Sequence, residues 1–161
     1  MPTRTLLFCA GIGLLVIGAM IGGGLFATRG THLELSGGLR KARTASLSAT
    51  RSVIVLDFRA TNTSDYPFVV KTVEVEVTLA SGKKEIGQFI PEVDAKTLFP
   101  ALPALGDKLA VSIGTGEKIA GKQTVDRMAA ASFTLPESDL ASRKDVTVRL
   151  RDVDGPMSEL R

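Results

Sequence analysis

Residues 52–82 read SVIVLDFRATNTSDYPFVVKTVEVEVTLASG and contain the clearest alternation of apolar and polar side chains in the chain. In the first half, one face of an extended strand would carry Ile54, Leu56, Phe58 and Ala60. In the second half, Val73, Val75, Val77 and Leu79 alternate with polar residues. A period of two places successive side chains on opposite faces of a strand, whereas a helix requires a period of 3.6. The second pattern is typical of an antiparallel strand with one buried and one wetted face.

The segment between these two strands has the composition of a turn. Asn62, Ser64 and Asp65 can hydrogen-bond their own backbone, and Pro67 directs Tyr66 toward extended backbone. The triplet at residues 62–64 also fits the N-glycosylation sequon, which matters only in a glycosylating secretory pathway. We favour the turn, and we expect Tyr66 to pack near one end of the domain.

The rest of the chain adds further short strands with turn signals between them. A strand pattern begins at Leu39, and the residues before it could include a short strand at Leu33–Leu35. Further strands are predicted at residues 85–90, 109–114, 124–136 and 145–153. A short helix is predicted from Asp94 through Phe99, ended by Pro100, and a further helical turn at residues 137–144. About seven strands in one domain favour an immunoglobulin-like antiparallel β-sandwich. We assign the β-sandwich domain to residues 39–155 and a C-terminal tail to residues 156–161.

The N-terminal region predicts a single transmembrane helix. No charged residue occurs from Thr5 to Thr28, and such a run can span a hydrocarbon core of about 30 Å. We assign the anchor to residues 1–28 and a linker to residues 29–38. Two alternatives are a cleaved signal peptide, whose apolar core is normally about 7–15 residues long, and a lipidated Cys9, before which a small residue would be needed in place of Phe8.

Small residues inside this run suggest contact between two helices. Gly18 and Gly22 form a GxxxG pair, and Gly11 lies one heptad earlier on roughly the same face. Small side chains let helix backbones approach closely in lipid, although glycine is frequent in membrane spans in general. The possible helix-dimer face is therefore Gly11, Gly18 and Gly22.

The charge is unevenly distributed along the chain. Residues 1–51 hold six basic side chains and one acidic side chain, whereas the remainder holds 14 basic and 16 acidic ones. With 5% aromatic residues, a nucleic-acid surface is not expected. Arg40, Lys41 and Arg43 could contact anionic lipid headgroups or could belong to a solvated strand face.

The membrane orientation is read from two opposing signals. Basic residues after the span favour a cytoplasmic domain, while a very short N-terminal tail before one span is the usual layout of a signal anchor. We expect a single-pass protein of the inner (cytoplasmic) membrane, with its domain on the extracytoplasmic side.

Two resemblances follow from these residues. LDFRATNTSDYPFVVKTVEVEVTLASG is similar to the centre of the LEA type 2 family, water-stress proteins with an immunoglobulin-like fold, over roughly residues 53–90. That family usually has proline after the turn asparagine, whereas Thr63 follows Asn62 here. The chain as a whole resembles uncharacterised single-span bacterial membrane proteins, seen especially in acidobacteria, through the blocks DFR, YPFVV, LFPALPALG, DRM and DVDG. The first resemblance implies the fold and the second implies the topology.

Motifs for catalysis or cofactor binding are incomplete. Residues 116–123, GEKIAGKQ, fit GxxxxGK but end in Gln where a phosphate-binding loop needs Ser or Thr. Asp152 and Asp154 match only part of a calcium loop. The single histidine, His32, and the single cysteine, Cys9, precede the domain, so neither a catalytic triad nor a zinc site is expected. We predict no catalytic residue, no cofactor and no metal.

Taken together, the sequence predicts a membrane-anchored, non-enzymatic β-sandwich protein that binds an unknown protein, envelope polymer or lipid. An LEA type 2-like protective role without a fixed partner is the alternative that the resemblance implies, and an enzyme is a remote third. The possible partner patch is Leu98, Phe99, Leu102 and Leu105. An exposed apolar patch there would support partner binding, and burial of these side chains would remove that support.

Overall fold

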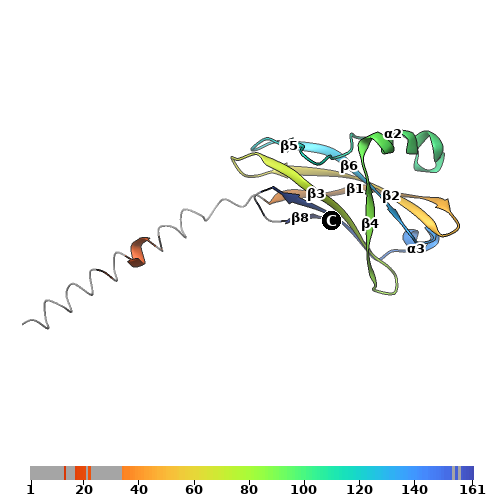
Figure 1. Ribbon diagram of the computed structural model, residues 1–161, viewed down its shortest axis with the longest axis horizontal. Helices are drawn as coiled ribbons and strands as arrows, with labels where there is room; N and C mark the ends of the chain where they lie inside the picture. The colour runs from red at the N-terminus through yellow and green to blue at the C-terminus, as the bar shows by residue number, and fades with distance from the viewer. Residues whose placement is uncertain (1–12, 14–16, 21, 23–33, 154, 156) are drawn as a thin grey trace, which may run out of the picture. The chain divides into compact units, whose positions relative to one another are not determined.

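The computed structural model describes residues 13, 17–20, 22, 34–153, 155 and 157–161. The chain divides into two units, Met1–His32 and Leu33–Arg161. Most of the predicted anchor lies outside the described residues, and among those that are described no helix is long and apolar enough to cross a membrane. The second unit is mainly β (Figure 1).

Among the described residues, the second unit contains eight strands and three helical segments. The strands are β1 (Leu35–Ser48), β2 (Arg51–Asn62), β3 (Phe68–Thr78), β4 (Lys84–Ile90), β5 (Lys118–Ile119), β6 (Thr124–Phe133), β7 (Asp145–Asp152) and β8 (Met157–Leu160). The helices are α2 (Glu92–Ala101), the 3-10 turn η1 (Pro103–Leu105) and α3 (Glu137–Ala141). The two strands predicted from residues 52–82 are confirmed as β2 and β3.

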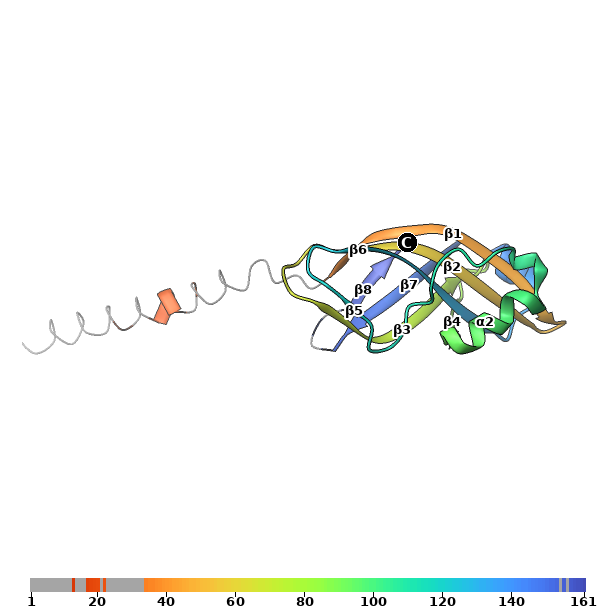
Figure 2. The ribbon, with the colours of Figure 1, turned by 90° about the horizontal axis from the view of Figure 1, so that it is seen from above.

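These strands form one antiparallel sheet that curls on itself. Its order is β1-β2-β6-β4-β3-β7-β8, with β5 paired to β3. The two outermost strands of this order meet, because the Leu39 N–H donates to the Arg161 carbonyl at 3.0 Å and the Leu35 N–H donates to Ser158 Oγ at 2.8 Å. Figure 2 shows β8 lying beside β1.

Strand β4 connects the half of the sheet that contains β6 to the half that contains β3. Residues Lys84–Gly87 pair with β3, and Gln88–Ile90 pair with β6. A Cβ at Gly87 would lie 2.5 Å from the Phe133 ring. Glycine is required at this crossing because any side chain there would meet the core.

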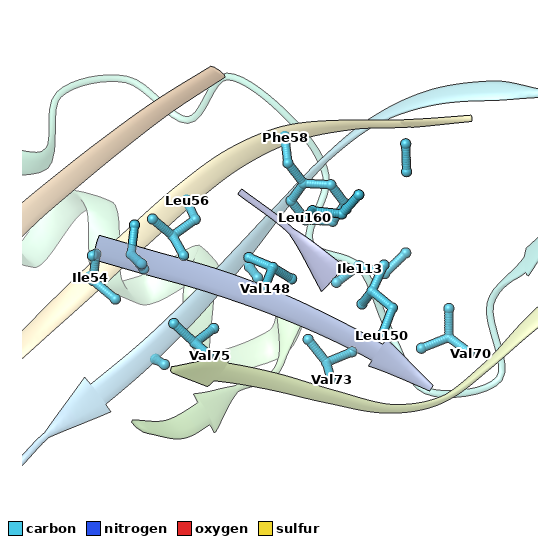
Figure 3. Close-up of a cluster of buried hydrophobic side chains, with 14 of the residues drawn as sticks. Ile54, Leu56, Phe58, Val70, Val73, Val75, Ile113, Val148, Leu150 and Leu160 are labelled. Carbon is cyan, nitrogen blue, oxygen red and sulfur yellow. The ribbon is translucent and has the colours of Figure 1, made fainter. Parts of the chain in front are cut away.

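The main core lies inside the curl (Figure 3). The alternation in β2 and β3 predicts its members correctly, since Ile54, Leu56, Phe58, Val73 and Val75 are all buried there. The opposite face of β2 is buried as well, which the alternation alone did not indicate. A second cluster on that outer face includes Val53, Val55, Ala95, Leu105 and Met128, contributed by β2, β6, α2 and η1.

Several predicted boundaries differ from the structure. β1 begins inside the predicted linker, because Leu35 pairs with Asn62 of β2. β8 occupies most of the predicted C-terminal tail, because Met157–Leu160 pair with β7. Residues 109–114 form only an isolated bridge, between Ser112 and Met128, and no strand. Helix α2 starts before Asp94 and includes Pro100 in its last turn.

Candidate functional site

The predicted partner patch forms the underside of a cap on the sheet. We define the cap as residues 92–112, which comprise α2, η1 and the loop after them. Leu105 is 1% exposed, and Leu98, Phe99 and Leu102 are half-buried against the second cluster. These four side chains do not form a fully exposed apolar patch, because they cover the outer face of β1, β2 and β6. Leu98 also lines a neighbouring hollow, and the role of the four residues as a partner patch stays a prediction.

Arg43 fastens this cap to the sheet. Its Nη2 forms an ion pair with Asp57 Oδ2 at 2.7 Å, and both side chains are 8% exposed. Its Nη1 donates to the carbonyl oxygens of Leu105, at 2.7 Å, and Asp107, at 2.6 Å. Its guanidinium carbon lies 5.4 Å from the centre of the Phe99 ring. Arg43 thus belongs neither to a solvated face nor to a lipid-binding surface.

Glu92 fastens the start of α2 to the loop that follows η1. Its Oε2 accepts from the Ser112 N–H at 2.9 Å, and its Oε1 forms an ion pair with Lys108. The hydrogen bond from Lys108 is the main reason that the pKa of the Glu92 carboxyl falls to about 2. Arg43 thus holds η1 and the following loop on the sheet, Glu92 joins the start of α2 to that loop, and α2 forms a wall on the outer face of the sheet.

Beside this wall the outer face is open and hollowed. A hollow of about 530 Å³ lies between α2 and the tips of β1 and β2. A smaller hollow of about 200 Å³ adjoins it, and the two share Arg51, Gln88 and Ser132. We call the two hollows together the Arg51 groove. Its larger part has the volume of an ordinary ligand site, and it is the candidate functional site.

The groove combines one cation, Arg51, with two acidic residues, Glu85 and Asp94, and with neutral polar groups and apolar walls. Arg51 is exposed, and its side chain makes no ion pair or hydrogen bond within the part of the chain that the structure describes. Gln88 and Ser132 are register partners on β4 and β6. Leu47, Ile90 and Leu98 supply apolar contact. Arg51, Gln88 and Ser132 can donate hydrogen bonds, so they can bind a ligand group that accepts hydrogen bonds.

Sequence reasoning did not single out Arg51. One arginine at the start of a strand, directly after the turn at Ala49 and Thr50, carries no local signal. Its position matters only because β4, β6 and α2, which are distant in sequence, come together around it.

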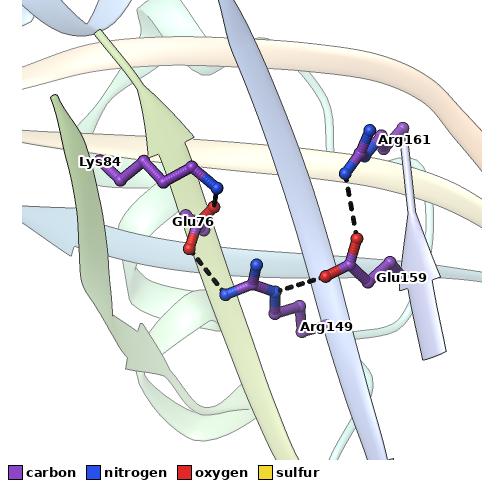
Figure 4. Close-up of polar contacts among 5 residues, drawn as sticks. All are labelled: Glu76, Lys84, Arg149, Glu159 and Arg161. Carbon is purple, nitrogen blue, oxygen red and sulfur yellow. Dashed lines mark hydrogen bonds and ion pairs between the residues drawn. The ribbon is translucent and has the colours of Figure 1, made fainter. Parts of the chain in front are cut away.

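The outer face of β3, β7 and β8 carries a chain of alternating charges (Figure 4). Lys84, Glu76, Arg149, Glu159 and Arg161 are joined by successive ion pairs. The hydrogen bond from Lys84 is the largest cause that lowers the pKa of Glu76. Each charge is satisfied by its neighbours, so this face needs no ligand to balance it.

The predicted turn at residues 62–66 is a structural element. Asn62 is fully buried. Its Nδ2 donates to the carbonyl oxygens of Tyr66, at 2.7 Å, and Ile119, at 3.1 Å, and its Oδ1 accepts from the N–H and hydroxyl of Ser64. In the folded domain this side chain is not accessible as a glycosylation acceptor. Tyr66 is 62% exposed, so the prediction that it packs is wrong.

Residues 116–123 pack against this turn. The Lys122 N–H donates to the Ser64 carbonyl at 3.0 Å, and a Cβ at Gly121 would lie 2.4 Å from the Asp65 carbonyl oxygen. Strand β6 follows, whereas a phosphate-binding loop leads into a helix. The glycine and lysine therefore close a turn between β5 and β6.

The other sequence-predicted positions are only partly described. Gly18 and Gly22 are described, and a Cβ at either would meet nothing within 4 Å, while Gly11 lies outside the described residues. Asp152 Oδ1 accepts from the Val69 N–H at 3.4 Å, and Asp154 is not described. In the described part of the chain, no group of three or more His, Cys, Asp or Glu could hold a metal ion.

Comparison with known proteins found no relative of this chain. No family model, no curated protein and no solved structure matches this chain.

Proposed function

We propose that this protein is a single-pass, membrane-anchored and non-enzymatic binding module, which holds an envelope partner in the Arg51 groove. The observation that carries the proposal is an open hollow of about 530 Å³ beside a wall fastened by buried and half-buried ion pairs. A hollow with apolar walls and with a cation that has no partner among the described residues has the features of a recognition site.

The anchor in this proposal rests on the uncharged run from Thr5 to Thr28. We propose that the domain lies on the extracytoplasmic side, and self-association through Gly11, Gly18 and Gly22 stays a prediction. We also propose that the curled sheet is a variant of the immunoglobulin-like sandwich, since its main core receives side chains from β2 and β6 on one side and from β3 and β7 on the other.

Site-specific photo-crosslinking in intact cells tests the groove. A photoreactive residue at Thr97, which lines the groove, should give a discrete crosslinked species in the membrane fraction. The same residue at Lys96, which is exposed on α2 but does not line the groove, is the matched control. Equal crosslinking from both positions would contradict the proposal. No crosslinks from either would favour an LEA type 2-like protective role without a fixed partner.

A further inference from the structure

We infer that the ligand of the Arg51 groove is an extended peptide that is held through the carboxylate of an acidic side chain. The inference rests on the proposed binding function and adds the chemical class of the ligand. Two features of the groove support it: a guanidinium without a partner among the described residues, and a trough that follows β4.

The unused guanidinium is the first feature. Elsewhere in the domain Arg43, Arg59, Arg127 and Arg149 each contact a carboxylate at 2.6–2.7 Å. Arg51, like Arg40 and Arg151, has no such partner among the described residues, but at its side chain two hollows meet. The planar guanidinium fork matches the two oxygens of a carboxylate, and this pairing is among the stronger polar contacts in proteins.

The shape of the groove is the second feature. The smaller hollow follows the first half of β4, at Glu85 and Ile86, and the larger one follows the second half, at Phe89 and Ile90. Together they form a trough along the strand, with Gln88 between them. Exposed apolar side chains stand along it, with Leu47 40% and Ile86 60% exposed. A trough of this form fits a chain molecule in extended conformation better than a compact small molecule.

The acidic residues of the groove restrict which anions fit. Glu85 lines the smaller hollow and Asp94 lines the larger one. A ligand with one carboxylate near Arg51 and apolar or basic neighbours is compatible with both, whereas a polyanion would be repelled by both. A peptide with a single acidic group therefore fits better than an anionic polymer.

Selection from a displayed library of random peptides tests the inference. The target is the full chain in lipid nanodiscs, and binding of each selected peptide is then measured by fluorescence anisotropy. We expect selected peptides to share one acidic group with apolar neighbours. Converting that group to its amide should weaken binding by about tenfold or more. Arg51→Gln should weaken binding of the acidic peptide similarly and should make the acid and amide forms bind equally.

Arg151→Gln is the matched control, because Arg151 is also exposed and its side chain also lacks an ion pair among the described residues. Arg151→Gln should leave the affinity for the acidic peptide within about twofold of the wild-type value. Failure to select any peptide, selected peptides without an acidic group, or equal affinity for wild type and Arg51→Gln would overturn the inference. A phosphoserine form that binds more than about tenfold more tightly than the acid would also overturn the carboxylate assignment. If crosslinks from Thr97 persist unchanged in Arg51→Gln, the groove still binds a partner and only the carboxylate is wrong.

Discussion

Replacing Arg43 by Met should destabilise the domain strongly. Methionine keeps the apolar stem against Phe99 but leaves the Asp57 carboxylate, whose side chain is 8% exposed, without its cationic partner. Removing one member of a buried ion pair typically costs about 3–5 kcal/mol. The Leu105 and Asp107 carbonyls also lose their donor. We therefore expect the free energy of unfolding to fall by about 3–5 kcal/mol at pH 7.

Replacing both members of the pair separates the buried charge from the lost contacts. In Arg43→Met with Asp57→Leu, no uncompensated charge remains in the second cluster. Apolar replacement of a buried pair is often neutral or stabilising, so the remaining loss comes mainly from the two carbonyl contacts, at about 1–2 kcal/mol. The double variant should thus be more stable than Arg43→Met alone, by about 2 kcal/mol.

Urea denaturation followed by circular dichroism measures these differences, since the midpoint falls with stability at constant slope. The control is Arg59→Met, which breaks an ion pair of the same 2.7 Å length whose side chains are 46% and 56% exposed. An exposed pair contributes less than about 1 kcal/mol. If Arg43→Met and Arg59→Met cost the same within about 0.5 kcal/mol, the fastening role of Arg43 is refuted.

Two further predictions concern the crossing strand and the cap. Gly87→Ala should destabilise the domain by about 1–3 kcal/mol because of overpacking, with its Cβ 2.5 Å from the Phe133 ring, whereas Gly114→Ala meets nothing within 4 Å and should cost clearly less in the same urea titration. The pKa of Glu92 falls from 4.5 to about 2 on folding, so its contribution is complete above pH 4.5 and disappears as the pH falls through 2. Glu92→Gln should therefore lower the free energy of unfolding by about 1–2 kcal/mol at pH 7 and by much less near pH 2. Thermal melts of both proteins at the two pH values measure this difference. An equal loss at both pH values would show that the ion pair with Lys108 does not act through this ionisation.

The strands were predictable because their signal is local. Alternation identified the core-facing residues of β2 and β3, and Asn62 with Pro67 marked the turn between them. The short strand β8 was missed because four residues after a turn carry too little pattern, and only pairing with β7 makes them a strand. The fate of residues 98–105 was also missed, since an apolar segment has the same sequence whether it faces solvent or a sheet.

By itself the sequence determined that this domain is built of antiparallel strands, because the period of two is a property of neighbouring residues and needs no partner to be read. It also determined that the residues needed for a catalytic triad or a zinc site are scarce, since the chain has one histidine, His32, and one cysteine, Cys9. Only the tertiary structure decided which polar residues are used. Asp57 and Arg43 look like members of a wetted face until α2 and η1 cover them. Arg51 has no distinguishing neighbours in sequence, and it becomes a candidate binding residue because β4 crosses the sheet beside it. Burial and free space arise from contacts between distant segments, and a local pattern does not contain them.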